Sequence, residues 1–137
     1  MGSYADDALF MSRNNIEYVE LISDDGKSKV MVIPAWQGRV MTTSAAGDEG
    51  DSYGWINYSF IKKRQIDLQF NPVGGEERFW LGPEGGVFSL YFRQGEKQIY
   101  KNWKVPPVLD IEAFKIQSQS KNCICLLYTS PSPRDTR

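Results

Sequence analysis

Residues 71–86 read NPVGGEERFWLGPEGG. Five glycines and two prolines fall within these sixteen residues. Glycine permits positive φ angles and close approach of the backbone to other groups, whereas proline fixes its own φ angle. This stretch is therefore shaped by its backbone, and its apolar centre, residues 79–81, predicts a single short strand. We expect the segments on either side to supply the rest of the regular structure.

The segment before this stretch begins with a predicted helix and a predicted hairpin. Residues 6–13 can form a short helix, with Ser3 or Asp6 as the N-cap. Residues 16–22 and 29–33 are rich in Ile, Val and Tyr, and an Asp-Gly pair lies between them. Because Asp-Gly favours tight turns between strands, we expect these two segments to pair antiparallel.

Strand patterns continue on both sides of residues 71–86. Residues 55–61 can begin as a strand and end as a helical turn, and residues 94–104 indicate an irregular or helical excursion. Further strands are predicted at residues 38–44, 87–93 and 111–117, and residues 62–70 are predicted to be a basic connector and an edge strand. About seven strands separated by turn signals predict an all-β fold, a sandwich or a barrel, in one domain.

The composition is that of a globular protein without a strong charge. The chain has 137 residues, of which 24% are charged, and its formal net charge is −1. This balance gives no electrostatic reason to expect a nucleic acid partner. The sequence shows neither a membrane-spanning run nor a signal peptide, so we expect no membrane partner and leave the compartment open.

Histidine is absent from the chain. Mechanisms that need a histidine acid, base or metal ligand within it are therefore excluded. The two cysteines, Cys123 and Cys125, are too few for a closed zinc site, which takes four ligands. The glycine pattern fits neither a P-loop nor a dinucleotide-binding fingerprint. We expect no metal and no cofactor.

Three glutamates are candidate acids: Glu76, Glu77 and Glu84. Two carboxylates flanking a sugar would suit a glycoside hydrolase. Neighbouring residues of a strand point to opposite faces, so only one of Glu76 and Glu77 could join Glu84. The alternative is that one glutamate pairs with Arg78 or Arg39 while the others are solvated.

Trp80 is the candidate stacking platform for a sugar ring, because it lies among glycines and charged residues. Arg39, Arg78 and Glu84 could add hydrogen bonds to sugar hydroxyls, so these four residues make up the predicted carbohydrate site. Most aromatic side chains pack in cores, however, and an arginine can equally anchor a turn or a carboxylate. No residue is assigned a catalytic role.

The C-terminal residues 125–135 read CLLYTSPSPRD and have no apolar period. Residues 125–137 resemble one reading frame of the adapter used in transposase-based sequencing libraries. This resemblance implies that residues 123–137 are a non-native, disordered tail and that residues 1–122 are the N-terminal part of a longer protein. The alternative is a genuine disordered tail.

Three segments carry a second resemblance: PAWQGRVMTTSAAGD, GWINYSFI and NPVGGEERFWLGPEGGVFSLYF. Over residues 4–116 the chain resembles an uncharacterised bacterial family, a domain of unknown function found largely in Bacteroidetes-type organisms. Members of this family look like galactose-mutarotase-like proteins. The resemblance implies that residues 1–122 are a truncated part of a β-supersandwich with a short N-terminal helix, whose concave sheet in relatives binds carbohydrate.

The resemblance carries no catalytic residue over to this chain. Well-studied mutarotases use histidines and a late glutamate, and this chain has no histidine. The leading hypothesis is a carbohydrate-binding fragment without activity, whose parent could be aldose epimerase-like or process polysaccharides. The alternatives are a non-catalytic structural or interaction module and, least favoured, the glycoside hydrolase. A truncated sandwich also exposes strand edges, so we expect self-association.

Overall fold

The computed structural model describes residues 2–129 of the chain. Its helices are α1 (Tyr4–Arg13), α2 (Tyr58–Lys63) and α3 (Pro107–Asp110), and 3-10 turns occur at η1 (Pro34–Trp36) and η2 (Tyr100–Asn102). Its strands are β1 (Val19–Ile22), β2 (Lys29–Ile33), β3 (Arg39–Ser44), β4 (Trp55–Ile56), β5 (Gly74–Gly75), β6 (Lys115–Gln119) and β7 (Ile124–Leu127). The described chain is β-rich, as the sequence predicts.

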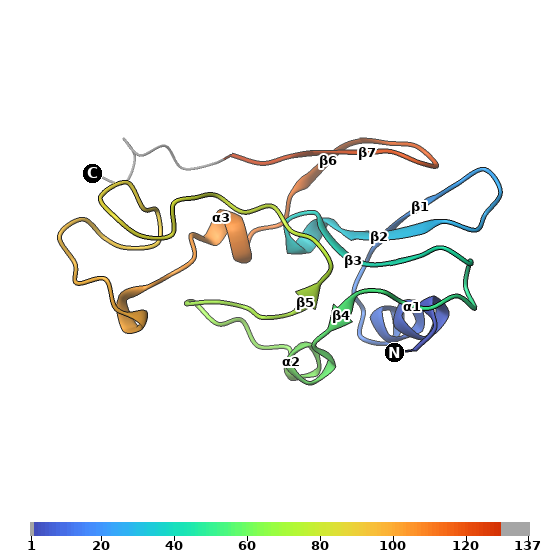
Figure 1. Cartoon of the computed structure of the whole chain (residues 1–137), viewed down its shortest axis with the longest axis horizontal. Helices are drawn as coiled ribbons and strands as arrows, with labels where there is room; N and C mark the ends of the chain where they lie inside the picture. Colours follow the sequence, from blue (N-terminus) through green and yellow to red (C-terminus); the bar gives the residue numbers. More distant parts are fainter. Residues whose placement is uncertain (1, 130–137) are drawn as a thin grey trace.

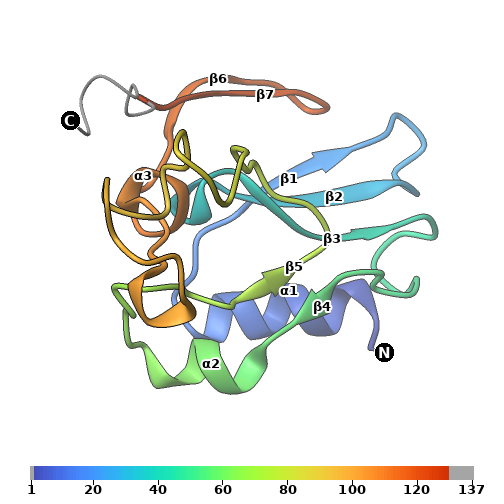
Figure 2. The same cartoon turned by 60° about the vertical axis from the view of Figure 1, so that its left-hand side comes forward.

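The elements lie in tiers, which Figures 1 and 2 show from two sides. The β6–β7 hairpin lies on one side of the three-stranded sheet β1-β2-β3, and helices α1 and α2 lie on the other. The short pair β4–β5 lies between the sheet and α2. No helix within residues 2–129 is long and apolar enough to cross a membrane.

Helix α1 begins at a capping box. The Ser3 Oγ accepts the Asp6 N–H at 3.2 Å, and the Asp6 carboxylate accepts the Ser3 N–H at 3.1 Å. The helix buries Tyr4, Asp7 and Met11, which lie on one face because they are three and four residues apart. The predicted N-terminal helix is confirmed and starts two residues earlier than expected.

The predicted hairpin and third strand are also confirmed. Strand β2 pairs antiparallel with β1 and with β3, and Val32 lies opposite Val19 on one side. The turn between β1 and β2 contains Gly26 at a φ angle of 72°. Met31, Ile33 and Met41 of the sheet are fully buried, so one face of the sheet contributes these side chains to a hydrophobic core.

Residues 71–86 run from one core to the other. Val73 lies in the first cluster, which joins α1, the sheet, β4 and α2, and residues 79–81 pack against the second cluster, around Tyr91 and Leu109. At Gly74 a Cβ atom would approach the Trp55 carbonyl oxygen to 2.3 Å, so only glycine fits beside β4. The glycine-rich stretch therefore links both cores by close backbone approach.

Three predicted strands are wrong. Residues 65–70 and 79–81 are irregular, and residues 87–93 form turns in which Val87 and Phe88 are 86% and 74% exposed. Alternating apolar residues become a strand only where a neighbouring strand accepts their hydrogen bonds. Within the described residues, none of these segments is paired in a sheet. The predicted last strand begins late, at Lys115, because residues 107–110 form α3.

The expected tail differs from the structure at its start. Residues 124–127 pair with β6 as β7, and Leu126 packs against the second core. Tyr128 stacks on Phe114 with ring centroids 4.6 Å apart. Residues 130–137 lie outside the described residues. The seven strands found within residues 2–129 form three small sheets and support a β-rich fold, and the supersandwich stays a prediction.

Candidate functional site

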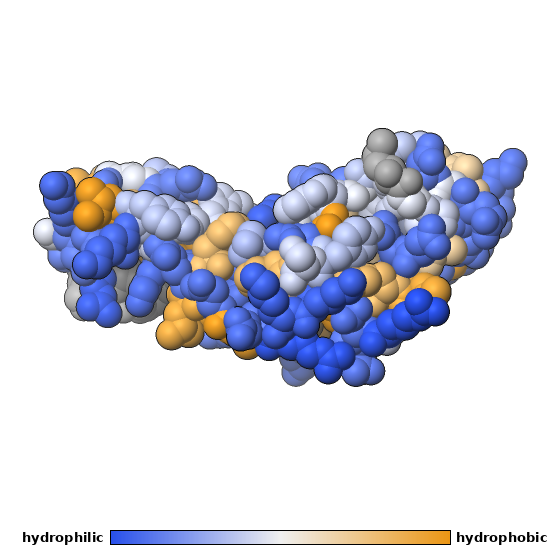
Figure 3. All heavy atoms as spheres, turned by 90° about the horizontal axis from the view of Figure 1, so that it is seen from below, coloured by the Kyte–Doolittle hydropathy of each residue, from blue (hydrophilic) through white to orange (hydrophobic). Residues whose placement is uncertain are grey.

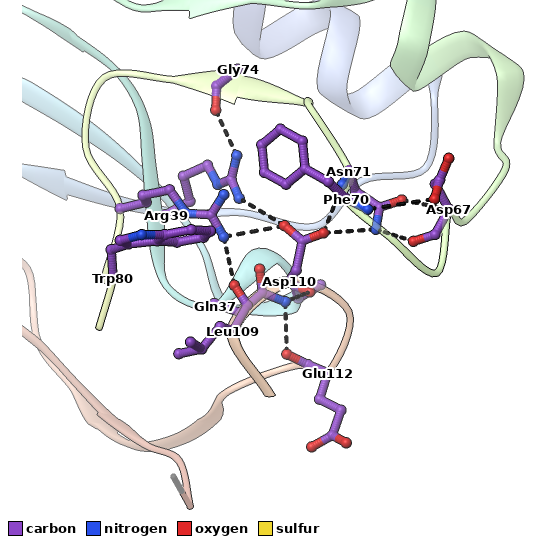
Figure 4. A network of polar contacts seen from close by, with 12 residues as sticks. Gln37, Arg39, Asp67, Phe70, Asn71, Gly74, Trp80, Leu109, Asp110 and Glu112 are labelled. Carbon is purple, nitrogen blue, oxygen red and sulfur yellow. Dashed lines mark hydrogen bonds and ion pairs between the residues drawn. The ribbon is translucent and has the colours of Figure 1, made fainter. Parts of the chain in front are cut away.

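Asp110, the last residue of α3, is the centre of a buried polar network (Figure 4). Its Oδ2 accepts the Asn71 backbone N–H at 2.6 Å and the Asn71 amide at 2.9 Å. Its Oδ1 lies 3.2 Å from Arg78 Nη2 and 3.8 Å from Arg39 Nη2. One carboxylate thus holds two of the predicted site residues and the first residue of the glycine-rich stretch.

Arg39 enters this network from the start of β3 and is 3% exposed. Its Nη1 donates to the Gly74 carbonyl at 2.8 Å, which ties β3 to β5. Burial lowers the pKa of Arg39 to about 10; the positive charge of Arg78 adds to this effect, and Asp110 opposes it. A guanidinium is normally protonated well above neutral pH, so Arg39 carries its charge here.

Arg78 and Trp80 contact each other directly. The Arg78 guanidinium lies 4.3 Å from the centroid of the Trp80 ring, and Tyr91 stacks on the same indole at 5.1 Å. Trp80 Nε1 donates to Glu84 at 2.6 Å. The four residues predicted for a carbohydrate site are therefore connected, but the indole of Trp80 is already used for internal packing.

The glutamates are not brought together by any contact among the described residues. Glu76 accepts a hydrogen bond from Thr43 of β3, and Glu84 accepts one from Trp80. Glu76, Glu77 and Glu84 are exposed. The arginines pair with Asp110 and not with one of these glutamates, which the sequence alternative expected.

A cavity of about 330 Å3 lies beside the network. Its polar wall is formed by Gln37, Arg39, Asn71 and Asp110, and Arg64 adds a second arginine. Trp36, Phe60, Ile61 and Val73 are among its apolar walls. Pockets for small molecules span roughly 300–1,000 Å3 and combine apolar walls with a few polar groups, so this cavity has the size and lining of a small one.

The polar wall holds two buried atoms without a hydrogen-bond partner in residues 2–129. They are Oε1 of Gln37 and Nε of Arg39. The Gln37 amide nitrogen is satisfied, since it donates to the Glu112 carbonyl at 2.8 Å (Figure 4). Unpaired buried polar atoms are uncommon in proteins and call for an explanation.

Unusual backbone conformations surround the same cavity. Among the described residues, three other than glycine have positive φ angles: Asn15 at 58°, Gln37 at 59° and Arg64 at 52°. Gln37 and Arg64 line the cavity, and Asn15 lies between the lining residues Asn14 and Ile16. Such conformations cost energy and concentrate at functional sites. The backbone therefore marks the same place as the buried polar atoms.

Sequence reasoning found Arg39 and missed the other members of the polar wall. Asp110 follows Pro106-Pro107, a proline pair just after the excursion predicted for residues 94–104. The missed signal is that proline starts a helix well, so that an acid three residues later lies in a helical turn. Gln37 and Asn71 carried no comparable sequence signal.

The remaining hollows are less defined. Cavities of about 320 and 630 Å3 are lined mainly by residues 86–107, of which only a few are buried. No group of three or more potential metal ligands occurs within residues 2–129. The cavity at Arg39 is therefore the candidate site.

Comparison with known proteins gives one match. A family described as a family of unknown function (DUF6786) matches residues 2–130, which include the first six residues of the adapter-like segment. No curated protein and no solved structure matches the chain. Because the match spans almost the whole sequence, the chain belongs to DUF6786, a family of unknown function.

Proposed function

We propose that the chain binds a small carbohydrate in the cavity beside Arg39 and catalyses no reaction on it. The observation that carries this proposal is the pair of buried unpartnered atoms, Gln37 Oε1 and Arg39 Nε. Leaving a buried polar group unpaired costs about 1–3 kcal/mol. A sugar hydroxyl both donates and accepts, so hydroxyls could donate to Gln37 and accept from Arg39.

The rest of the cavity supports the same class of ligand. Trp36 and Phe60, which also line the cavity, offer aromatic surface to the apolar face of a sugar ring. The volume of about 330 Å3 suits one ring and not a long chain. The two unpartnered atoms are shielded from water in the free chain. Binding therefore requires a small shift of the lining side chains.

The family resemblance of residues 4–116 supports a larger setting for this site. In this proposal the described strands are one part of a galactose-mutarotase-like supersandwich in a longer bacterial parent. The β-rich character of residues 2–129 agrees with that setting without distinguishing it from other β folds. Among the described residues that line the cavity, Asp110 is the only one with a carboxylate. Hydrolysis of a glycoside needs two, so the proposal includes no hydrolysis.

Isothermal titration of the full chain with glucose, galactose and mannose tests the proposal. We expect heat of binding for at least one sugar, and a change in tryptophan fluorescence that Trp36→Phe abolishes. Trp80→Phe is the matched variant, because Trp80 does not line the cavity. Loss of binding in Trp80→Phe with Trp36→Phe unaffected would move the site to the platform predicted from the sequence.

A structural module is the second candidate, and one observation favours it. Arg78, Trp80 and Asp110 are all used in internal contacts, which is the arrangement expected if the charges only hold segments together. Under this alternative no sugar gives heat, and substitutions in the cavity change stability alone. The titration above separates the two functions.

A further inference from the structure

We propose that the carbohydrate taken by the cavity beside Arg39 is an acidic sugar, one that carries a carboxylate as uronic acids do. This inference rests on the proposed function and adds the charge of the ligand to it. The observation behind it is that the buried network holds two guanidinium groups against one carboxylate. Nothing else in the described chain neutralises the second positive charge at close range.

The imbalance lies in the least exposed part of the site. The side chains of Arg39 and Asp110 are 4% and 1% exposed, and that of Arg78 is 21% exposed. Asp110 Oδ2 is already occupied by Asn71, so Oδ1 alone faces both arginines. The Nε atoms of both Arg39 and Arg78 are buried without a partner, and of these two residues only Arg39 lines the cavity. Guanidinium groups with unused donors favour a carboxylate, which can accept from them with charge assistance.

Arg64 extends this charge to the solvent side of the cavity. It is exposed, lines the cavity, and caps α2 in the left-handed conformation. Glycine is the usual residue at such a position. A long cation there places positive charge at an exposed part of the cavity lining.

The nearest negative groups do not cancel this charge. Asp67 and Glu112 neighbour lining residues, but both are exposed and neither lines the cavity. The Asp67 carboxylate accepts backbone N–H groups of Gln69 and Phe70. Exposed charges are weakened by water and salt far more than buried ones. Among the lining residues, Arg39 and Arg64 therefore outweigh Asp110.

The test compares sodium D-glucuronate with D-glucose, which differ in the acidic group but share the ring. Isothermal titration of the full chain at low salt should show glucuronate binding about tenfold more tightly than glucose, because charge-assisted hydrogen bonds are roughly twice as strong as neutral ones. Added sodium chloride should reduce this preference, since the charge of Arg64 is exposed. Sodium acetate at the same concentration should compete poorly.

Arg64→Gln is the decisive variant, because an exposed residue can be changed without disturbing the core. We expect it to weaken glucuronate binding several-fold and glucose binding much less, so that the preference for glucuronate shrinks. Arg93→Gln is the matched control, since it removes the same charge from an exposed residue outside the cavity. It should change neither affinity.

The possible outcomes test the acidic group, the sugar and the cavity separately. Equal affinities for glucuronate and glucose would overturn the acidic ligand and leave the carbohydrate site standing. Acetate competing as well as glucuronate would show a simple anion site and overturn the sugar. An unchanged preference in Arg64→Gln would overturn the role given to this cavity. Binding of neither sugar would remove both proposals together.

Discussion

At the scale of single residues, Asp110 matters most, because two arginines and an asparagine depend on one side chain. Its partners come from positions 39, 71 and 78, far apart in the sequence. A buried carboxylate of this kind holds segments together only while it keeps its charge and its geometry. We therefore expect substitutions of Asp110 to destabilise the network more than substitutions of its individual partners.

Asp110→Asn should lower the free energy of unfolding by about 3–5 kcal/mol, because it leaves buried arginines without a counter-charge. The midpoint of urea unfolding measures this change. Asp24→Asn is the matched control: Asp24 pairs with Lys121 at 3.4 Å, but its side chain is 99% exposed. The control should leave the midpoint unchanged. Equal effects of the two substitutions would show that Asp110 has no special role.

Tyr91 gives a prediction for alkaline pH. Its hydroxyl donates to the Leu81 carbonyl at 2.6 Å, and burial raises its pKa to about 12. The folded chain then holds a proton that the unfolded chain has lost, so this stabilising effect is present below about pH 10 and disappears as the pH rises through 12.

Tyr91→Phe should flatten this alkaline loss and cost about 1 kcal/mol at neutral pH, where the hydrogen bond is missing. Urea midpoints of both chains between neutral and alkaline pH measure the difference. Arg39 and Tyr58 also titrate there, but their effects cancel because both chains contain them. An identical pH dependence in the two chains would contradict the raised pKa of Tyr91.

At the scale of elements, short helix α2 ends in a way that conflicts with its sequence. Arg64 adopts a φ angle of 52° at the C-cap, and the Arg64 N–H donates to the Ile61 carbonyl at 3.1 Å. An L-residue in this conformation is strained by contact of its Cβ with the backbone. The arginine therefore stays at a position that a smaller residue would occupy with less strain.

Arg64→Gly should leave the free energy of unfolding unchanged or raise it by up to about 1 kcal/mol, since glycine relieves the strain and loses some chain entropy. Lys62→Gly, inside α2, should lower it by about 1 kcal/mol. Thermal unfolding of the two variants gives the comparison. A strong loss of stability in Arg64→Gly would show that the arginine is retained for packing and not for a ligand.

The elements that could be predicted from the sequence are those decided by neighbouring residues. Ser3 and Asp6 form a capping box, and Asp25-Gly26 forms the turn of the hairpin, so α1, β1 and β2 follow from local chemistry. Residues 87–93 alternate just as well, yet they form turns, because a strand needs a partner that local sequence does not supply. Prediction failed for segments whose structure depends on pairing with residues far away in the sequence.

The same division applies to the candidate site. Arg39 was found because a charge at the start of a strand is visible in the sequence. Its counter-charge, Asp110, lies in a helix that the sequence reading missed, and the glutamates favoured there are on the surface. Which carboxylate meets which arginine depends on packing of distant segments, so it could not be predicted from spacing.

At the scale of the whole molecule, the surface carries exposed apolar side chains and an open strand edge. Apolar side chains show on the face drawn in Figure 3, and Ile66 and Leu68 are 69% and 72% exposed. Within residues 2–129, strand β1 pairs in its sheet only with β2, and on its outer side the Ile22 N–H donates to the Lys121 carbonyl at 2.8 Å. Open strand edges promote pairing between chains.

We expect the chain to self-associate through the outer edge of β1, and Glu20→Pro to reduce it. Backbone N–H groups two residues apart in a strand point to the same side, so the Glu20 N–H points outward like the Ile22 N–H. Proline at position 20 removes this N–H group and leaves the hydrogen bonds between β1 and β2 in place. Glu20→Gln is the matched control, since it removes the same charge but keeps the N–H. Sedimentation equilibrium at rising concentration measures association. A monomer at every concentration would contradict the prediction.

The distance along the chain between Arg39 and Asp110 has a consequence for biosynthesis. Position 110 minus position 39 is 71 residues, and ribosomes add about 5–20 residues each second, so roughly 4–14 s pass between the two. During that time the sheet β1-β2-β3 can form, but Arg39 has no counter-charge and the polar wall is incomplete. Ligand binding should therefore begin only when the end of α3 has left the ribosome, and a nascent chain stalled before Asp110 should be folded in part yet unable to bind.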